Sequence, residues 1–570
     1  MRIVHRVGVQ DSAAHIVDVE MRVSSDVPLP SPLVVTMAVW TPGSYLVREY
    51  SRHVEAVSAD TLSAQKTAKN TWSVAHDSAQ EITVRYRVYC NDLTVRTNHA
   101  DATHVYLNGA PTFLAVAGHE GAYEIEIDAP MAWRVATPLP AIHGRRNAFR
   151  AADYDELVDS PIECGEHDEH PFEAAGQKHR YDVWPKGALS TTHAENLMRD
   201  TRMIVDTEAK LLGGGLPHDG YTFILHLSSR GRGGLEHNAS STLIAPATAP
   251  HTREGWLDLL SLVAHEYFHL WNVKRIRPAG LFPYRYDREN YTRLLWWFEG
   301  GTSYFDWRVL RLAGLCTEEE YLDHLAAEVA YVEQTPGRNA HALEEASFDA
   351  WIKLYRPDEN SSNSTISYYR KGEIVNAMMD VEVRARSDGK SSLDAILLAL
   401  WQRYGSKGVP VPEDGMQSIF EDVSGCALGD LFDAWVRGRR DLDYSTFARV
   451  GLSLERVTKG TAAISARLSS SAGRVGVSSV ARGGAAHRAG VDPGDELISI
   501  DGRRVDSTSL DSALAGKNAG DRVEVIVSRD GRTHTLSLDL DGARLDKVRL
   551  VPNKDATPEQ IALRAAWLQT

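Results

Sequence analysis

The sequence predicts a multidomain α+β protein in which a β-rich N-terminal domain and a β-rich C-terminal module flank a largely helical region. Three observations favour this fold class. The chain has 570 residues, which is too long for one hydrophobic core and corresponds to about three to four domains. Apolar and polar residues alternate in residues 1–175 and again after 450, as they do in half-buried strands. From 255 to 440 the apolar residues recur at the spacing of amphipathic helices.

Composition and charge exclude several classes of function. Hydrophobic residues make up 43% of the chain and charged residues 24%, which are ordinary values for a globular protein. No run approaches the roughly 20 apolar residues that a membrane span needs. The formal net charge of −15 argues against nucleic acid or an anionic membrane as the main partner, because both bind basic surfaces. We therefore expect no nucleic-acid partner and no membrane span.

The cysteines and the N-terminus bear on the cellular compartment. Cys90, Cys164, Cys316 and Cys426 stand singly without a CxxC pair, so they are predicted to be free, buried thiols. The N-terminus lacks the apolar core of a secretory signal, which as written predicts a cytoplasmic protein. A signal peptide that had been removed would leave the same sequence, so a periplasmic location stays open.

Residues 1–175 are predicted to form an N-terminal β-sandwich domain. The strand patterns are separated by Pro, Gly, Ser and Asn, and the clearest lie at 15–23, 33–40 and 82–89. Within this domain stands the polar and aromatic segment TPGSYLVREY at 41–50. We predict either a loop that faces a substrate cleft or a structural turn with a surface arginine, and the sequence does not favour one over the other.

A second domain is predicted at 176–445. Its first part, to about 250, is predicted to continue as strands, most clearly at 221–227. The motif GGLEH follows at 233–237. Gly233 and Gly234 would let a substrate backbone approach closely, and the Glu236 carboxylate would receive a substrate ammonium group. By itself the motif is better explained by a turn with a solvated glutamate.

The most informative stretch is LVAHEYFHLW at 262–271, which holds an HExxH pattern within a helix predicted at 256–273. Residues four apart share one face of a helix, so His265 and His269 can present two imidazoles to one metal ion. Glu266 would stand beside the metal as a general base. This arrangement is typical of zinc hydrolases, although an isolated HExxH also occurs by chance in unrelated helices.

Glu299 is the candidate for the third protein ligand. Catalytic zinc sites use three protein ligands and keep the fourth position for water. Glu299 lies in an apolar, aromatic-rich segment, LLWWFEGGTSY, within a helix predicted at 291–312. A carboxylate buried there without a partner would be costly, which favours a role as a metal ligand.

Further helices complete the second domain, and a β-rich module is predicted at 446–545. The helices are predicted at 318–334, 366–386, 391–404 and 428–437, with a polar loop at 357–365 and the motif YRKG at 369–372. In the module, AGVDPGDELISIDG at 489–502 combines a helix capped by Gly490, a Pro-Gly-Asp turn, a strand and an Asp-Gly hairpin. This run resembles a PDZ domain. Residues 546–570 are predicted to be a C-terminal extension that ends in a helix.

The motifs together resemble the M61 family of glycyl aminopeptidases, which are relatives of the M1 aminopeptidases within the gluzincins. The segments that carry the resemblance are HEYFHLWNVKRIRP at 265–278, FEGGTSYFD at 298–306, GGLEH at 233–237 and YRKG at 369–372, together with the PDZ-like module. The resemblance covers essentially the whole chain in domain order. It implies a thermolysin-like catalytic domain with a mostly helical lobe, preceded by the β-sandwich and followed by the PDZ domain.

The resemblance also implies residue roles. His265, His269 and Glu299 would bind one Zn²⁺ per chain, and Glu266 would be the general base. Glu236 matches the M1 glutamate that binds the substrate α-amine, and Gly233 and Gly234 would line the substrate. The last residue of that M1 motif is Asn, whereas this chain has His237, whose role stays open. Tyr369 matches the tyrosine that stabilises the oxyanion, but Tyr368 is adjacent and a shift of one residue would exchange the two.

These inferences predict a zinc aminopeptidase that hydrolyses the first peptide bond of peptides with a free N-terminus. The preference for glycine or alanine follows from the resemblance alone. The PDZ domain is expected to bind the C-terminus of a peptide or protein. Two other hypotheses stay open, namely a zinc endopeptidase of the same chemistry and a PDZ scaffold whose metal site is vestigial.

Overall fold

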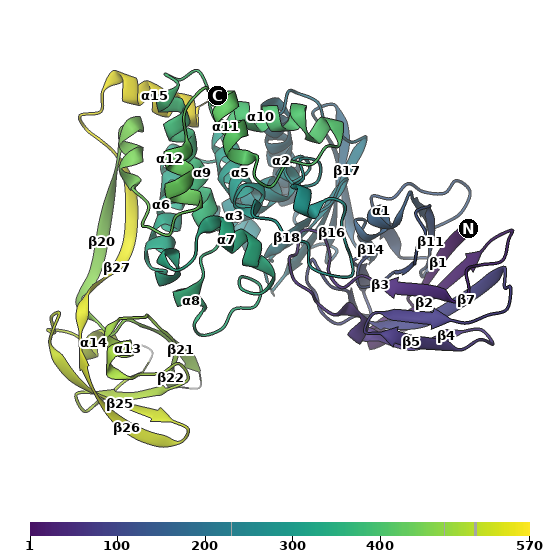
Figure 1. Cartoon of the computed structure of the whole chain (residues 1–570), viewed down its shortest axis with the longest axis horizontal. Helices are drawn as coiled ribbons and strands as arrows, with labels where there is room; N and C mark the ends of the chain where they lie inside the picture. The colour runs from purple at the N-terminus through teal and green to yellow at the C-terminus, as the bar shows by residue number, and fades with distance from the viewer. Residues whose placement is uncertain (230, 472, 507–509, 570) are drawn as a thin grey trace. The chain divides into compact units, whose positions relative to one another are not determined.

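The computed structural model describes residues 1–229, 231–471, 473–506 and 510–569, and its helices and strands are drawn in Figure 1. The chain divides into two compact units. The first unit comprises residues 1–292, 305–315 and 397–412, and the second comprises 293–304, 316–396 and 413–570. The predicted β-rich N-terminal domain, helical middle region and C-terminal PDZ strands are all present, which confirms the predicted fold class.

The N-terminal domain is built from three sheets. Alternating apolar residues of the first two sheets, such as Val7 and Val35, share one hydrophobic core, so these sheets pack face to face. The first sheet has the order β13 (Ala148–Ala151), β11 (Tyr123–Asp128), β1 (Arg2–Gly8), β2 (Ile16–Ser24), β7 (Glu81–Tyr89), β4 (Val54–Ala59). The second has the order β10 (Leu114–Val116), β3 (Leu33–Met37), β6 (Thr71–Val74), β5 (Ala64–Ala68). The third has the order β12 (Arg134–Ala136), β14 (Ile162–Gly165), β9 (His104–Leu107), β8 (His99–Ala100).

A five-stranded sheet follows in the first unit and carries the GGLE segment on its edge. Strand β18 (Gly233–Glu236) pairs antiparallel with β19 only, so its outer edge is unpaired within the sheet. The full order is β15 (Asp168–Ala174), β16 (Gln177–Trp184), β17 (Gly220–Ser228), β19 (Ser240–Pro246), β18.

Residues 191–211 form helix α2 (Thr191–Leu211), so the prediction of strands throughout 176–250 is wrong there. Ser190 caps the helix by accepting a hydrogen bond from the His193 amide. Buried residues then recur three and four apart, as at Leu197, Thr201, Ile204 and Glu208, and this is the helical rather than the strand period.

The HExxH segment lies on α3 (Arg253–Phe268), which packs against α2, β18 and β19. Thr252 caps its N-terminus by accepting a hydrogen bond from the Gly255 amide. The helix ends at Phe268, five residues earlier than predicted, with the second histidine as its C-terminal cap, and Val273 beyond it has a φ of 119°.

Most of the other helices lie in the second unit. The helix predicted at 291–312 is broken in two, with Glu299 at the junction between α4 (Leu295–Phe298) and α5 (Gly300–Leu312). The one predicted at 428–437 is α12 (Gly429–Leu431) continued by a π-helical turn at Phe432–Val436. The other helices are α6 (Glu318–Glu333), α7 (Leu343–Phe348), α8 (Ser361–Ser364), α9 (Arg370–Arg386), α10 (Leu393–Arg403), α11 (Met416–Ser424) and α15 (Pro558–Leu568).

The PDZ region has a sheet with the order β21 (Ala466–Ser471), β22 (Arg474–Val480), β23 (Glu496–Ile500), β25 (Arg522–Arg529), β26 (Arg532–Asp539). As predicted, Gly490 ends the short helix α13 (Ala485–Ala489) in a left-handed conformation. A separate antiparallel ribbon joins β20 (Leu452–Ala463) to β27 (Asp541–Pro552). Among the described helices, none has the length and apolar composition required to span a membrane. All four cysteines are free, as predicted, but only Cys90, Cys164 and Cys316 are buried, whereas Cys426 is partly exposed.

Candidate active site

Strand β18 and helix α3 bring Gly234 against Glu266. Glu266 is 4% exposed, and a Cβ atom built on Gly234 would lie only 2.1 Å from its Oε1 and 2.2 Å from its Cδ. No residue with a side chain fits at 234 while Glu266 keeps this position. We predicted that Gly234 admits a substrate backbone, and the structure adds that its missing side chain makes room for the carboxylate.

The two histidines of α3 are oriented by hydrogen bonds at Nδ1. The rings of His265 and His269 have centroids 4.7 Å apart and are nearly perpendicular, at 85°. His265 Nδ1 lies 2.9 Å from Oδ2 of Asp306, and His269 Nδ1 lies 2.7 Å from the Asn272 carbonyl oxygen. Carboxylate and carbonyl oxygens accept hydrogen bonds, so each Nδ1 carries the hydrogen and each Nε2 has the lone pair that a metal requires.

Glu236 lies close to both motif residues. Ligand-type atoms of Glu236, Glu266 and His269 all lie within 4.8 Å of one another. Glu236 is 3% exposed, and its Oε1 has no hydrogen-bond partner among the described residues. A buried carboxylate oxygen without a partner is unfavourable, so this atom is suited to receiving a cation from a ligand.

His237, whose role the sequence left open, is held by a buried aspartate from the N-terminal domain. Its Nδ1 lies 3.1 Å from Oδ1 of Asp159, which also accepts from Lys274 Nζ at 2.7 Å. The other oxygen of Asp159 accepts the backbone amide of Asn238 at 2.8 Å. Burial opposes the charge on Asp159, but Lys274 and His237 together hold its pKa below the usual value. The hydrogen bonds of Asp159 to His237 and Asn238 therefore fix the chain directly after Glu236, at the end of β18.

In the second unit, close backbone packing sets the surroundings of Glu299. A Cβ on Gly300 would lie 2.5 Å from the Tyr368 carbonyl oxygen and 2.6 Å from Cα of Gly372. Two glycines, one after Glu299 and one in the YRKG motif, therefore allow this contact. Glu299 is 2% exposed. Burial raises the pKa of the Tyr368 hydroxyl, and the nearby Tyr355 and Glu299 raise it further.

The two adjacent tyrosines differ in environment. Tyr368 is fully buried, whereas Tyr369 is half-buried at the start of α9. Their rings are stacked with centroids 4.7 Å apart, and the Tyr369 hydroxyl lies 3.1 Å from that of Tyr355. The two tyrosines therefore belong to one cluster of packed aromatic side chains. That Tyr369, rather than Tyr368, stabilises the oxyanion stays a prediction.

Besides Asp159, sequence reasoning did not single out two further carboxylates of this region. Asp306 orients His265, and the motif that carries Glu299 ends on it. Glu208 of α2 is fully buried, and neither of its oxygens has a hydrogen-bond partner among the described residues. Burial, and then the charge of Asp306, raise the pKa of Glu208 well above its usual value. No sequence pattern marks Glu208, because its neighbours are distant along the chain.

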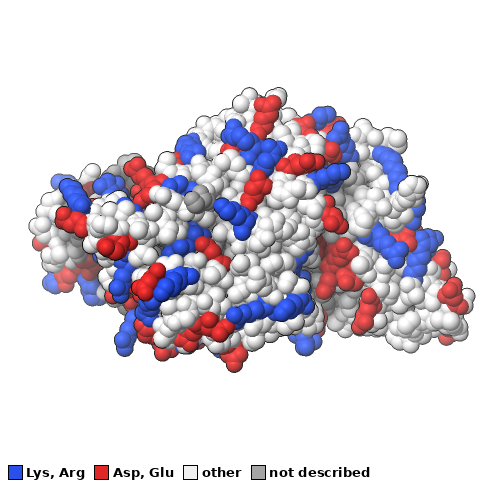
Figure 2. All heavy atoms as spheres, turned by 90° about the horizontal axis from the view of Figure 1, so that it is seen from above, with Lys and Arg blue, Asp and Glu red and all other residues white. Residues whose placement is uncertain are grey.

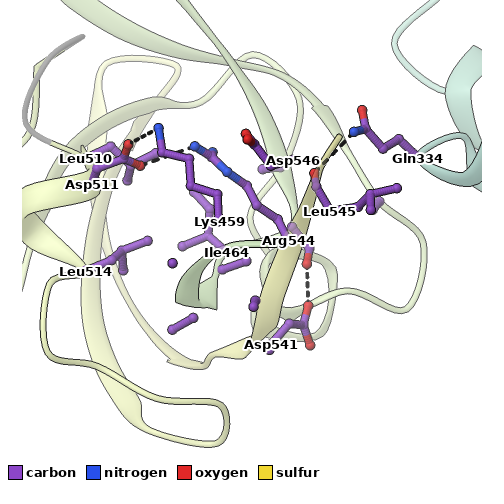
Figure 3. A pocket seen from close by; sticks show the side chains of 18 of the residues that line it. Gln334, Lys459, Ile464, Leu510, Asp511, Leu514, Asp541, Arg544, Leu545 and Asp546 are labelled. Carbon is purple, nitrogen blue, oxygen red and sulfur yellow. Dashed lines mark hydrogen bonds and ion pairs between the residues drawn. The ribbon is translucent and has the colours of Figure 1, made fainter. Parts of the chain in front are cut away.

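A pocket in the second unit adjoins the PDZ region (Figure 3). It is lined by the end of β20 and the start of β27, by Leu510 and Leu514 of the PDZ region, and by Gln334 after α6. Asp511 pairs with Lys459 at 2.7 Å and with Arg544 at 3.4 Å, so the charges at one side of the pocket are largely neutralised.

Comparison with protein families gives three matches. The model described as M61 glycyl aminopeptidase matches residues 258–375, the one described as peptidase M61 N-terminal domain matches 5–166, and a PDZ domain model matches 450–540. No curated protein matches the chain.

Solved structures provide a second comparison. The chain is similar to an aminopeptidase N family protein from Idiomarina loihiensis, with 27% identity, a TM-score of 0.93 and full coverage of both chains, each at 100%. An M1 zinc metallopeptidase from Deinococcus radiodurans matches with 14% identity and a TM-score of 0.47 over 78% of this chain and 95% of that one. Yeast LTA4 hydrolase matches with 13% identity and a TM-score of 0.47 over 79% and 70%. The M61 N-terminal domain, the M61 glycyl aminopeptidase domain and the PDZ domain thus match in this order along the chain, and the chain is a metallopeptidase.

Proposed function

We propose that this protein is a zinc-dependent aminopeptidase that removes the first residue of peptides with a free N-terminus, with a preference for glycine and alanine. The observation that carries the proposal is the buried Glu236 carboxylate, whose Oε1 lacks a partner among the described residues and which lies close to Glu266 and His269. A substrate α-ammonium would satisfy this carboxylate through a charge-assisted hydrogen bond. The preference for small residues rests on the family description.

We propose His265, His269 and Glu299 as the zinc ligands. The two histidines come from the HExxH pattern at the end of α3, and Glu299 comes from the FEGGTSYFD motif. The donor set fits zinc, because two imidazoles with hydrogen-bonded Nδ1 atoms and one carboxylate leave room for a further ligand. When bound, zinc supplies Lewis-acid chemistry that polarises the scissile carbonyl and acidifies water.

Three residues of the chain would then each have one role in the reaction. Glu266 accepts a proton from the attacking water and returns it to the leaving amine. Glu236 holds the α-ammonium and thereby aligns the first peptide bond with Glu266. The Tyr369 hydroxyl donates a hydrogen bond to the carbonyl oxygen as negative charge develops there.

Cleavage of free and N-acetylated peptides tests the proposal. We expect efficient hydrolysis of glycyl and alanyl substrates with a free amine and very poor hydrolysis of their acetylated forms, which lack the positive charge. Glu236→Ala should narrow this gap, chiefly by impairing the free-amine substrate. Comparable kcat/KM for the two forms in the unmutated enzyme would instead support a zinc endopeptidase.

For the PDZ region we propose binding of a peptide or protein C-terminus by strand addition. Strand β21 supports this proposal, because it stands at the edge of its sheet and its residues are largely exposed. On the face shown in Figure 2, acidic and basic side chains are interspersed. Binding of fluorescent peptides with a free or amidated C-terminus would test the PDZ proposal.

A further inference from the structure

We infer that Gly43 of the N-terminal domain is a positioning residue for Glu236 and closes the amine-binding end of the substrate site. The inference rests on the proposed role of Glu236 and extends it. It assigns to the TPGSYLVREY segment the task of limiting cleavage to the first peptide bond.

The geometry at Gly43 leaves no space for a side chain. Gly43 has a φ of +83°, and a Cβ atom there would lie 2.5 Å from Oε2, 2.6 Å from Oε1 and 2.7 Å from Cδ of Glu236. All three distances are far below van der Waals contact. The backbone of this loop therefore packs directly on both oxygens of the carboxylate that is proposed to receive the substrate amine.

The turn that contains Gly43 is well anchored. Thr41 and Ser44 form an isolated β-bridge, and the Ser44 amide donates to the Thr41 carbonyl at 3.1 Å. Arg48 Nη2 donates to Ser44 Oγ at 2.7 Å. Thr41 and Ser44 are 1% and 0% exposed. Because the turn is buried and hydrogen-bonded, a methyl group added at Gly43 would displace the Glu236 carboxylate rather than the turn.

This contact gives a physical reason for exopeptidase specificity. The Glu236 carboxylate is bounded by the Gly43 backbone, so a substrate ammonium has to approach it from the side of Glu266 and His269. A residue preceding that ammonium would compete for the space that the N-terminal domain occupies. The loop therefore acts as the end wall of the amine subsite.

The test compares Gly43→Ala with Gly118→Ala. Gly118 lies in the same domain with a φ of +75°, but a Cβ there meets nothing within 4 Å, so it controls for backbone strain alone. For a glycyl substrate with a free amine, we expect Gly43→Ala to lower kcat/KM at least tenfold, mainly through KM, and Gly118→Ala to change it less than twofold. Equal effects of the two variants would overturn the inference.

A double-mutant cycle shows whether Gly43 acts through Glu236. In a Glu236→Ala background the obstructed carboxylate is gone, so adding Gly43→Ala should cause less than a twofold further loss. The same tenfold loss in both backgrounds would refute the positioning role. If Gly43→Ala does not fold, Ser44→Ala is the milder variant, because it removes only the acceptor for Arg48. It should raise KM two- to fivefold, and an unchanged KM would count against the inference.

The outcomes separate this inference from the proposed function. Equal hydrolysis of free and acetylated substrates by the unmutated enzyme would overturn both, since no amine subsite would exist. Strong discrimination in the unmutated enzyme, together with no difference between Gly43→Ala and Gly118→Ala, would leave the aminopeptidase proposal intact and overturn only the role of Gly43.

Discussion

Gly234 and Glu266 are packed so closely that one methyl group on the glycine would overlap the glutamate carboxylate. The edge strand of the sheet therefore fixes the position of the proposed general base through its backbone. Proton transfer is sensitive to such placement, because the base must lie within hydrogen-bond reach of the proton that it takes.

Gly234→Ala should accordingly lower kcat by about 10²-fold or more, since general-base catalysis contributes roughly that much. The matched control is Gly220→Ala in β17 of the same sheet. A Cβ at Gly220 would meet the Lys178 carbonyl oxygen at an ordinary 3.6 Å, and this variant should keep most of the activity. Steady-state kinetics on a glycyl substrate measures both, and similar losses would show that the sheet, rather than Glu266, is the sensitive element.

Metal removal tests the proposed ligands. The purified protein should contain about one zinc per chain and lose activity with a chelator, and added zinc should restore it. Glu266→Gln should keep the metal and abolish turnover, because an amide does not accept the proton. His265→Ala should lose the metal itself. Full activity in metal-free protein would refute the zinc proposal.

Asp306 accepts a hydrogen bond from Nδ1 of His265 at 2.9 Å. By orienting this histidine, it should strengthen the binding of the metal ion. Loss of such a partner typically weakens metal binding by about 10- to 100-fold, so we expect that effect for Asp306→Ala. Asp306→Asn retains an acceptor oxygen and should keep most of the affinity. Competition against a zinc-binding dye measures both. Unchanged affinity in Asp306→Ala would mean that the bond does not orient the ligand.

Tyr369→Phe should lower kcat by roughly 10²-fold with little change in KM, because the hydroxyl is proposed to act on developing negative charge. Tyr368→Phe serves as the comparison, since its ring stacks on that of Tyr369 at 4.7 Å. If Tyr368→Phe alone shows the defect, the motif has been matched one residue out of register.

We predict that Lys371 of the YRKG motif makes the stability of the folded protein depend on pH. It is 1% exposed, its Nζ has no hydrogen-bond partner among the described residues, and burial lowers its pKa to about 8. Between this value and the roughly 10.4 of an unfolded lysine, the unfolded chain binds more protons, so the contribution of Lys371 to stability rises with pH across this window. Below pH 8 the folded protein carries the full cost of a buried charge.

Lys371→Met should therefore raise the Tm at pH 7, and its advantage should shrink as the pH approaches about 10.5. Lys390, which is 80% exposed, provides the control, because Lys390→Met should show no such dependence. Calorimetry over this pH range measures the difference between each variant and the unmutated protein. If the difference in Tm between Lys371→Met and the unmutated protein stays constant with pH, the lowered pKa of Lys371 is contradicted.

The sequence predicts this protein well where short spacing determines the structure. The i, i+4 spacing of His265 and His269 places both on one helix, and Gly490 marks the end of its helix. The break at Glu299 was missed, because it depends on packing of Gly300 against Gly372, which lies 72 residues further along the chain. The partners Asp159 and Glu208 were missed for the same reason, since tertiary packing alone brings them to the site.

Asp159 has a consequence for the evolution and engineering of this protein. The residue belongs to the segment matched by the N-terminal domain model, yet it neutralises Lys274 after the metal-motif helix and holds His237 after the edge strand. A peptidase segment cut free from the N-terminal domain would retain a buried lysine without its counter-ion and would lose the loop that packs on Glu236. The two domains are therefore not interchangeable modules, and a chimera that exchanges one without the other should fail even if each part folds.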